Sequence, residues 1–395
     1  MKSFTSKSLI ALIALAISAF AIGTTEFVIV GLLQTVASDL SISVTKAGTL
    51  VSGYAAAIAI GTPIVTAMTS RLPKKGLLLS LLIIFIAGNT LSAIADTYSL
   101  LLLSRIITAV AHGVFFAIAA TVAADFVPKD KQAQAISIMF TGLTVATILG
   151  VPFGTLIGQH FGWRATFLAV AVLGVIALIT NWVSIDKPER KEDKLTIRDI
   201  GRLIGNPRII LALLMTSLGF GGTFALFTYL TPILEKVSSI SPDHIFWMLL
   251  LYGAATAVGN IIGGKITNQH PVKALRWVFL FQLTALLLQM ILLPNTMLSH
   301  LSIILLGLFA FMMSPGVQSY IVSLAEKLVP SAKDLASALN ISGFNIGIAA
   351  GSALGGFAIN YLDYLDTAWI GGLMVLAALI LAVINYRLDQ KQKLF

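Results

Sequence analysis

The sequence lacks cysteine and has few charged residues. With no Cys among its 395 residues, it offers neither a disulfide framework nor a thiolate nucleophile. Only 11% of the residues are charged and 57% are hydrophobic, and the mean hydropathy is +0.94. This composition leaves too little polar surface to cover a soluble globule of this length, so it predicts an integral membrane protein.

Motifs for nucleotide and metal chemistry are also absent from the sequence. It has no GxxxxGK(S/T) phosphate-binding loop, no HExxH pair and no Cys/His cluster with the spacing of metal ligands. We therefore expect no direct drive by ATP, no bound metal or other cofactor, and no catalytic residues. These absences argue against a membrane-embedded enzyme.

Apolar runs of about 20 residues, the length that a helix needs to cross the hydrocarbon core, recur along the chain. We predict an all-α membrane protein with twelve spans, at 8–35, 45–69, 76–96, 99–127, 133–160, 163–185, 209–236, 242–268, 275–294, 299–326, 334–361 and 367–387. The first span could be read as a signal peptide, because Lys2 and Lys7 precede it. Its apolar run continues to Leu33, however, which is longer than a signal peptide needs.

The basic residues indicate how the spans are oriented. If the N-terminus is cytoplasmic, 21 of the 26 Lys and Arg residues lie in tails and loops on that side, as the positive-inside rule requires. Both termini are therefore predicted in the cytoplasm, with the chain in a bacterial-type inner membrane. The same distribution explains the net charge of +9 without nucleic acid, because a DNA-binding surface would cluster the charges on one soluble domain.

The longest polar segment, Asp186–Arg208, divides the chain into two halves of six spans each. We predict an N-terminal bundle at 1–185, a cytoplasmic linker at 186–208 with an amphipathic helix around Ile197–Ile204, and a C-terminal bundle at 209–395. The halves repeat, because GTPIVTAMTSRLPKK from Gly61 and GNIIGGKITNQHPVK from Gly259 both end the second span of their half. Repeated six-helix units are typical of transporters that bind substrate between two bundles.

Small residues recur every four positions in the fifth and eleventh spans. The fifth has Gly142, Ala146, Gly150, Gly154 and Gly158, and the eleventh has Gly343, Gly347, Gly351 and Gly355. This spacing places each set on one helix face, where a neighbouring helix can approach closely. We interpret both sets as sliding surfaces at the seam between the bundles, with a bend at Pro152. Static helix packing is the alternative.

Several motifs resemble those of a transporter family. The run from Gly142 to Phe167 resembles the fifth-helix antiporter motif of the major facilitator superfamily, and Leu103-Ser104-Arg105 resembles its fourth-helix motif. TTEFVIVGLL, AHGVFF, FTYLTP and SGFNIGIAAGSALGG are similar to segments of the sugar-efflux and arabinose-efflux-like permeases among its twelve-span drug:proton antiporters. The resemblance covers essentially the whole chain and implies proton-driven export, but it is much less specific for the substrate.

The loop between the second and third spans departs from the family pattern. Where the family has Gly-x-x-x-Asp-Arg-x-Gly-Arg, this chain lacks the aspartate and both glycines. Arg71, Lys74 and Lys75 are therefore expected either to anchor the topology or to meet Asp125 or the backbone ends of neighbouring helices.

Three ionisable residues lie deep within spans. Glu26 is the only such residue among seventeen acidic ones, and Arg105 and His112 are the only deep arginine and histidine. A charge at the bilayer centre costs about 2.5 to 3.5 kcal/mol, so all three are expected to face the protein interior or water. We predict that they form a proton-coupling site. The alternatives are a Glu26–Arg105 ion pair that only pins two helices, and a His112 that binds substrate or packs in the core.

Polar and aromatic side chains within the spans are candidates for substrate binding. We select Tyr229, Asn345, Gln318, Phe116, Phe227 and Trp247. The polar side chains could instead hydrogen-bond between helices, which is the interpretation favoured for Thr24, Thr25 and Asn340, and the aromatic ones could face lipid or the core. The set suits a small neutral or weakly polar solute.

Together these features predict a monomeric, proton-coupled secondary transporter that exports small molecules such as sugars or drugs by alternating access. Proton-coupled uptake and the export of purines or nucleosides are the alternatives within transport. A membrane-embedded sensor or enzyme is a more remote alternative, because no catalytic set accompanies Glu26.

Overall fold

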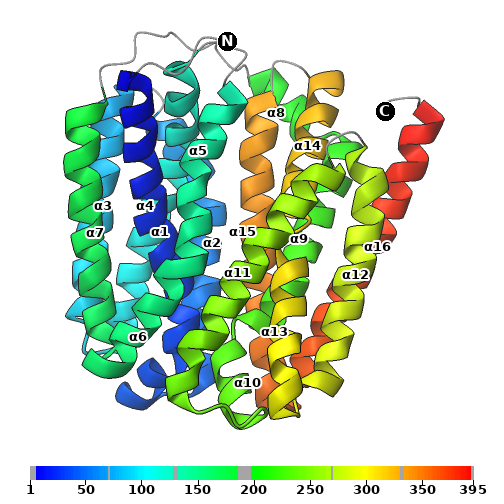
Figure 1. The fold of residues 1–395 in the computed structure, drawn as a ribbon. Coiled ribbons are helices and arrows are strands. Elements are labelled where there is room, and N and C mark those ends of the chain that lie inside the picture. Colours follow the sequence, from blue (N-terminus) through cyan, green and yellow to red (C-terminus); the bar gives the residue numbers. More distant parts are fainter. Residues whose placement is uncertain are drawn as a thin grey trace. The chain divides into compact units, whose positions relative to one another are not determined.

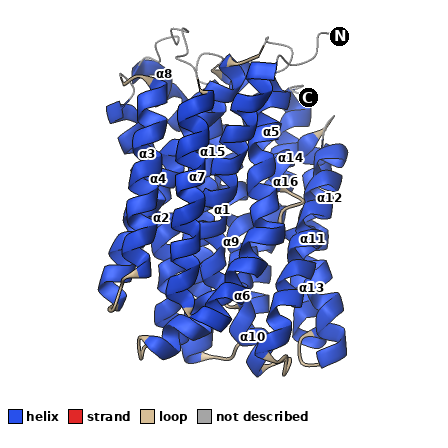
Figure 2. Cartoon of the chain, turned by 60° about the vertical axis from the view of Figure 1, so that its left-hand side comes forward, coloured by secondary structure: helices blue, strands red, loops and turns tan. Residues whose placement is uncertain are grey.

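The computed structural model describes residues 6–69, 72–127, 132–185, 197–267, 270–329 and 333–392. Within these ranges the regular structure is helical, and Figure 2 shows helices joined by short loops. Among these described residues, twelve helical stretches are long and apolar enough to cross a membrane, which confirms the twelve predicted spans and the all-α fold class.

The helices follow the order of the predicted spans (Figure 1). The first six spans are α1 (Ser6–Asp39), α2 (Val44–Thr69), α3 (Lys74–Ala93), α4 (Tyr98–Asp125), α5 with η2 and α6 (Gln132–Val145, Ala146–Gly150 and Val151–Phe161), and α7 (Trp163–Ser184). The last six are α9 with α10 (Pro207–Phe227 and Leu230–Lys236), α11 (Pro242–Thr267), α12 (Pro271–Leu292), α13 with α14 (Thr296–Ala310 and Ser314–Leu328), α15 (Lys333–Tyr361) and α16 (Asp366–Gln392).

The predicted linker contains the short helix α8 (Ile197–Ile204), which coincides with the amphipathic helix expected there. Asn206 then caps α9, since its side chain accepts a hydrogen bond from the Arg208 N–H, and Pro207 occupies the first turn, where its missing N–H costs nothing. Residues 186–196 of the linker lie outside the described residues.

Three spans are interrupted, whereas the sequence predicted continuous helices with a single bend at Pro152. The fifth span contains the π-helical turn η2 immediately before α6, with Pro152 in the first turn of α6. The seventh breaks at Tyr229, with φ −108° and ψ 19°, and the tenth breaks at Phe311, with φ −112° and ψ 2°. Both residues occupy the bridge region of backbone conformation, which ends the helical hydrogen-bond pattern locally.

Contacts divide the chain into two compact units. Unit 1 comprises Met1–Ser43 and Ala56–Glu192, and unit 2 comprises Val44–Ala55 and Asp193–Phe395. The division at Glu192 falls within the predicted linker. The first part of α2 belongs to unit 2, which the predicted halves did not include.

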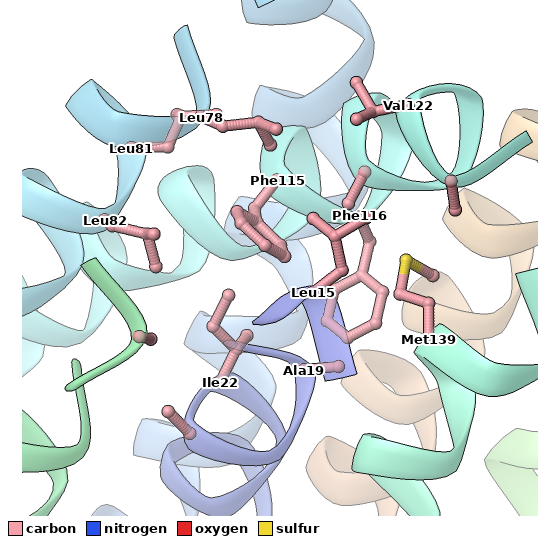
Figure 3. Packing of buried hydrophobic residues seen from close by; sticks show 14 of the residues in the cluster. Leu15, Ala19, Ile22, Leu78, Leu81, Leu82, Phe115, Phe116, Val122 and Met139 are labelled. Carbon is pink, nitrogen blue, oxygen red and sulfur yellow. The ribbon is translucent and has the colours of Figure 1, made fainter. Parts of the chain in front are cut away.

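The core of unit 1 lies where α1, α3, α4 and α5 meet. Figure 3 shows buried side chains from these helices packing together, among them Leu15, Ile22, Leu78, Leu82, Phe115, Phe116 and Met139. Because lipid is as apolar as leucine, such contacts stabilise a membrane bundle through close packing rather than through removal from water.

The small-residue ladders lie inside the units, and their predicted location at a seam between bundles is wrong. A Cβ added at Gly150 would lie 2.1 Å from Oγ1 of Thr24 on α1. A Cβ added at Gly351 would lie 2.0 Å from the carbonyl oxygen of Gly221 on α9. A four-residue spacing identifies a helix face but not the helix that covers it, so the sequence could not distinguish the two locations.

Candidate functional site

The deep carboxylate lies in the interior of unit 1, on the largely buried helix α1. Glu26 is 7% exposed, and every residue of α1 from Ala21 to Leu33 is buried. Its Oε2 lies 4.0 Å from Nε2 of His112 on α4. His112 is itself 8% exposed. The structure therefore brings the side chains of Glu26 and His112 together, and Arg105, the third residue predicted for the proton-coupling site, contacts the same turn of α1.

Arg105 holds the backbone that carries Glu26. Its guanidinium donates to the carbonyl oxygen of Thr25 at 2.5 Å and to the carbonyl oxygen of Glu26 at 3.3 Å. The Thr25 hydroxyl donates to Oδ1 of Asn89 on α3 at 2.6 Å. These bonds fix the turn of α1 around Glu26 against α3 and α4, and they support the interhelical role favoured for Thr25.

Aromatic rings extend the site along α4. The rings of His112 and Phe116 lie 5.0 Å apart, and Phe116 stacks on Phe140 of α5 at 5.4 Å. Phe116 is 4% exposed. A solute that reached His112 would therefore meet an apolar aromatic wall.

Gln318 of unit 2 lies in a polar network that joins three helices. The Thr216 hydroxyl of α9 donates to Oδ1 of Asn340 on α15, the Asn340 amide donates to Oε1 of Gln318 on α14, and the Gln318 amide donates to the Ser337 hydroxyl. Each of these bonds is 2.6 to 2.7 Å long. Asn340 thus has the interhelical role that the sequence favoured.

Asn345 is buried next to an aromatic cluster that the sequence did not single out. Its amide donates to the carbonyl oxygen of Ile341 at 2.9 Å, while its Oδ1 is buried and accepts no hydrogen bond from the described residues. The ring of the adjacent Phe344 packs on Phe220, with 4.0 Å between the ring centroids. Both rings also contact Phe311 at the break between α13 and α14. A buried acceptor beside aromatic rings keeps Asn345 a candidate for substrate binding.

Tyr229 fills a slot lined by glycines. Its side chain is 1% exposed, and its hydroxyl donates to the carbonyl oxygen of Ser352 at 3.1 Å. A Cβ at Gly48, in the part of α2 that belongs to unit 2, would lie 2.2 Å from the Tyr229 hydroxyl oxygen, and one at Gly356 would lie 2.6 Å from it. These contacts favour a packing role for Tyr229.

The other two aromatic candidates differ in exposure. Phe227 is 3% exposed and stacks on Tyr252 at 4.5 Å, which fits a core position. Trp247 is 62% exposed, as a lipid-facing side chain would be.

Two lysines at the start of α3 meet the partners that the sequence suggested. Nζ of Lys74 lies 3.4 Å from Oδ2 of Asp125 at the end of α4, and Nζ of Lys75 donates to the carbonyl oxygen of Trp182 near the end of α7 at 2.9 Å. Arg71 lies outside the described residues. Lys74 thus forms an ion pair although the usual aspartate of this loop is missing.

The opposite end of unit 1 has an ion pair that sequence reasoning missed. Arg164, in the first turn of α7, pairs with Asp39 at the end of α1 at 2.7 Å and donates to the carbonyl oxygen of Ala95. The Trp163 indole donates to the same carboxylate at 3.1 Å. Gly162 turns the chain into α7 with φ 84°, a conformation that favours glycine. This arrangement explains the Gly-Trp-Arg sequence after the fifth span.

Unit 2 contains a second buried carboxylate. Asp389 of α16 is 3% exposed and pairs with Arg208 of α9, and the Arg208 guanidinium also donates to the Tyr320 hydroxyl of α14 at 2.9 Å. The sequence placed Asp389 near the end of a span and did not select it. Its partner is a buried arginine, so the pair ties three helices together at one end of the unit.

The repeat places a neutral residue in unit 2 where unit 1 has Glu26. Gly150 faces Thr24, and the repeated glycine, Gly351, faces Gly221. Glu26 lies two residues after Thr24, and Thr223 lies two residues after Gly221, so Glu26 and Thr223 occupy equivalent positions in the two units. The Thr223 hydroxyl accepts a hydrogen bond from Gln282 at 2.7 Å. Only one of the two equivalent positions therefore carries a titratable group.

Comparisons with known proteins agree with this architecture. Residues 15–332 match the profile of the Major Facilitator Superfamily. The chain is 51% identical over 381 residues to YtbD of Bacillus subtilis (strain 168), described as an uncharacterized MFS-type transporter, with 96% of each chain covered. It is 38% identical over 383 residues to YdhP of Escherichia coli (strain K12), described as an inner membrane transport protein, with 95% of this chain and 96% of the relative covered.

A solved structure shows the same fold at low sequence identity. A bacterial homolog of the human lysosomal transporter Spinster, in an inward-facing and occupied conformation, superposes with a TM-score of 0.78 and 17% identity over 95% of this chain and 96% of that chain.

Proposed function

Because the chain belongs to the Major Facilitator Superfamily, we propose that it is a proton-coupled secondary transporter that exports a small molecule, with Glu26 as the proton-carrying group. Transport, rather than catalysis, is the activity of its relatives and of its fold. The proton, the direction and the assignment to the drug:proton antiporters are our proposal.

One observation carries the proposal: a buried carboxylate faces a histidine in unit 1, while the equivalent position in unit 2 is a threonine. An ionisable group buried in a membrane bundle is costly unless its charge is used or balanced. Arg105 donates to backbone carbonyl oxygens of the same turn, so its described bonds anchor the helix and leave the carboxylate beside His112. Such a carboxylate can take up a proton from one side of the membrane and release it to the other.

The proposed proton-binding residues and the candidate substrate-binding residues lie in different units. Protons bind in unit 1 at Glu26 and His112, with Arg105 fixing the α1 backbone and Phe116 beside His112. Asn345 and Gln318 of unit 2 are the remaining candidates for substrate contacts, and the protein acts as a monomer. The substrate is a sugar, a drug-like amphiphile, a purine or a nucleoside, and proton-driven uptake is the alternative direction.

Transport into everted membrane vesicles tests this function. The vesicles come from a host without its main efflux pumps, are energised with lactate, and receive ethidium, radiolabelled arabinose or radiolabelled inosine. We expect at least one probe to accumulate, and nigericin, which collapses the pH gradient, to release it. Accumulation that survives nigericin combined with valinomycin and potassium, which together also collapse the membrane potential, would contradict proton coupling, and accumulation in right-side-out vesicles instead would indicate uptake.

The orientation is also a proposal. Both termini face the cytoplasm of a bacterial-type inner membrane, the bundles comprise 1–185 and 209–395, and 186–208 links them. Because the chain has no Cys, a single cysteine reports its own side of the membrane. We expect Asn295→Cys, before α13, to react with an impermeant maleimide in intact cells, and Lys194→Cys, outside the described residues, to react only after lysis. Reaction of both from the same side would contradict the twelve-span topology.

A further inference from the structure

The π-helical turn η2 lies directly against the turn of α1 that carries Glu26. Its backbone is widened at Ala146–Gly150, and the Val151 N–H donates to the carbonyl oxygen of Ala146. Pro152 explains the widening, because proline has no N–H to donate and its ring would collide with the carbonyl group four residues earlier in an α-helix. Short π-helical turns are rare in proteins, and those that do occur are often found at functional sites.

The contact between η2 and α1 leaves no space. A Cβ at Gly150 would lie 2.1 Å from Oγ1 of Thr24, and a Cβ at Gly23 would lie 3.0 Å from Cβ of Ala146. The Thr24 hydroxyl is itself held, because it donates to the carbonyl oxygen of Phe20 at 2.8 Å. One side of the segment from Gly23 to Glu26 is therefore determined by η2.

A different helix determines the other side of the same segment. Arg105 of α4 donates to the carbonyl oxygens of Thr25 and Glu26. The segment is thus clamped between a glycine contact and an arginine, and its last residue extends a carboxylate toward His112 at 4.0 Å.

We propose that η2 is a positioning element for Glu26: Ala146, Gly150 and Pro152 hold the 23–26 segment so that the carboxylate faces His112. This inference rests on the proposed role of Glu26. Unit 2 supports it by contrast, because there α15 continues without a π-helical turn from Lys333 to Tyr361 and the residue equivalent to Glu26 is Thr223. The π-helical turn and the carboxylate thus occur in the same unit.

The charged surroundings of Glu26 do not come from η2 itself. Residues 132–150 contain no titratable side chain. Arg105 and His112 of α4 are the charged or titratable groups beside the carboxylate, and α3 adds the neutral Asn89. A change in η2 would therefore act on Glu26 through its position relative to these groups.

Carbodiimide labelling measures this effect without a known substrate. Dicyclohexylcarbodiimide reacts with protonated carboxyl groups in apolar surroundings, so its reaction with purified protein at a series of pH values reports the protonation of Glu26. Mass spectrometry of the Glu26 peptide gives the midpoint, and Glu26→Gln gives the background. Two variants test the role of η2. Gly150→Ala adds a methyl group that forces η2 away from Thr24, and Pro152→Ala allows residues 146–150 to form an ordinary α-helical turn.

We expect both substitutions to move the labelling midpoint by about 0.5 pH unit or more. Gly158→Ala is the matched control, because its Cβ would meet Cδ2 of Leu32 at 2.2 Å on the same pair of helices but two turns away. It should leave the midpoint unchanged. Adding Thr24→Ala to Gly150→Ala removes the colliding hydroxyl and should restore the midpoint, which a general loss of packing would not do.

The outcomes separate this inference from the proposed function. A wild-type midpoint in both Gly150→Ala and Pro152→Ala would overturn the positioning role of η2 and leave proton coupling intact. Labelling of wild-type Glu26 that does not vary with pH would instead overturn the role of Glu26.

Discussion

Glu26→Gln is expected to abolish accumulation of substrate against its gradient while the protein still folds and inserts. Glutamine has nearly the shape of a protonated glutamate but cannot exchange a proton, so the variant stays in one protonation state throughout the cycle. The measurement is uptake into everted vesicles at equal protein level, where we expect a loss of at least about tenfold, the size of effect that 1.4 kcal/mol of lost coupling produces.

A matched control separates this effect from the loss of any carboxylate in a span. Glu235→Gln removes the carboxylate of α10, which lies outside the Glu26 site, and should transport as the wild type does. Downhill movement of substrate should persist in Glu26→Gln, because alternating access does not itself need the proton. Uphill accumulation by Glu26→Gln at the wild-type level would reduce Glu26 to a packing residue.

Gly351→Leu is expected to prevent assembly of unit 2. Gly351 of α15 packs directly against the backbone of α9. A Cβ added at Gly351 would lie 2.0 Å from the carbonyl oxygen of Gly221 and 2.8 Å from its Cα. A backbone cannot move aside as a side chain can, so the leucine must separate α15 from α9. Even Gly351→Ala should cost about 1–3 kcal/mol, the usual cost of overpacking.

The measurement is the yield of monodisperse protein and its thermal unfolding in detergent. Gly264→Ala is the control, because a Cβ there would meet only Pro315, at 3.9 Å, and it should unfold at the wild-type temperature or slightly above. Normal yield and thermal stability of Gly351→Leu with loss of transport alone would instead show that the ladder acts as a sliding surface.

The sequence predicted the parts of this structure that depend on local patterns. The spans follow from apolar length, α8 follows from its amphipathic pattern, and the ion pair of Lys74 with Asp125 was one of the two expected alternatives. Glu26 and His112 could be selected because a charge deep in a span is rare enough to need a reason.

The remaining features depend on which helices become neighbours. Spacing identified the faces of the glycine ladders but not α1 and α9 as their partners. Asp389 was not selected because it lies near the end of a predicted span. The sequence does not show that Arg208 and Tyr320, from two other helices, cover its carboxylate. The break at Tyr229, by contrast, had a local signal that the sequence analysis did not use, because the ring of Pro232 would collide with the carbonyl group of Thr228 in a continuous α-helix. The close contacts of Tyr229 with Gly48 and Gly356 favour packing over the predicted binding role.

Proton movement driven by a substrate gradient tests the central claim most directly. Purified protein in liposomes loaded with pyranine receives an inward gradient of whichever probe accumulates in vesicles, with valinomycin and potassium holding the membrane potential at zero. For the wild type we predict proton efflux from the lumen, and hence alkalinisation, in fixed proportion to substrate entry, and for Glu26→Gln substrate entry without a pH change. Substrate entry by the wild type with no change in luminal pH would contradict proton coupling at Glu26.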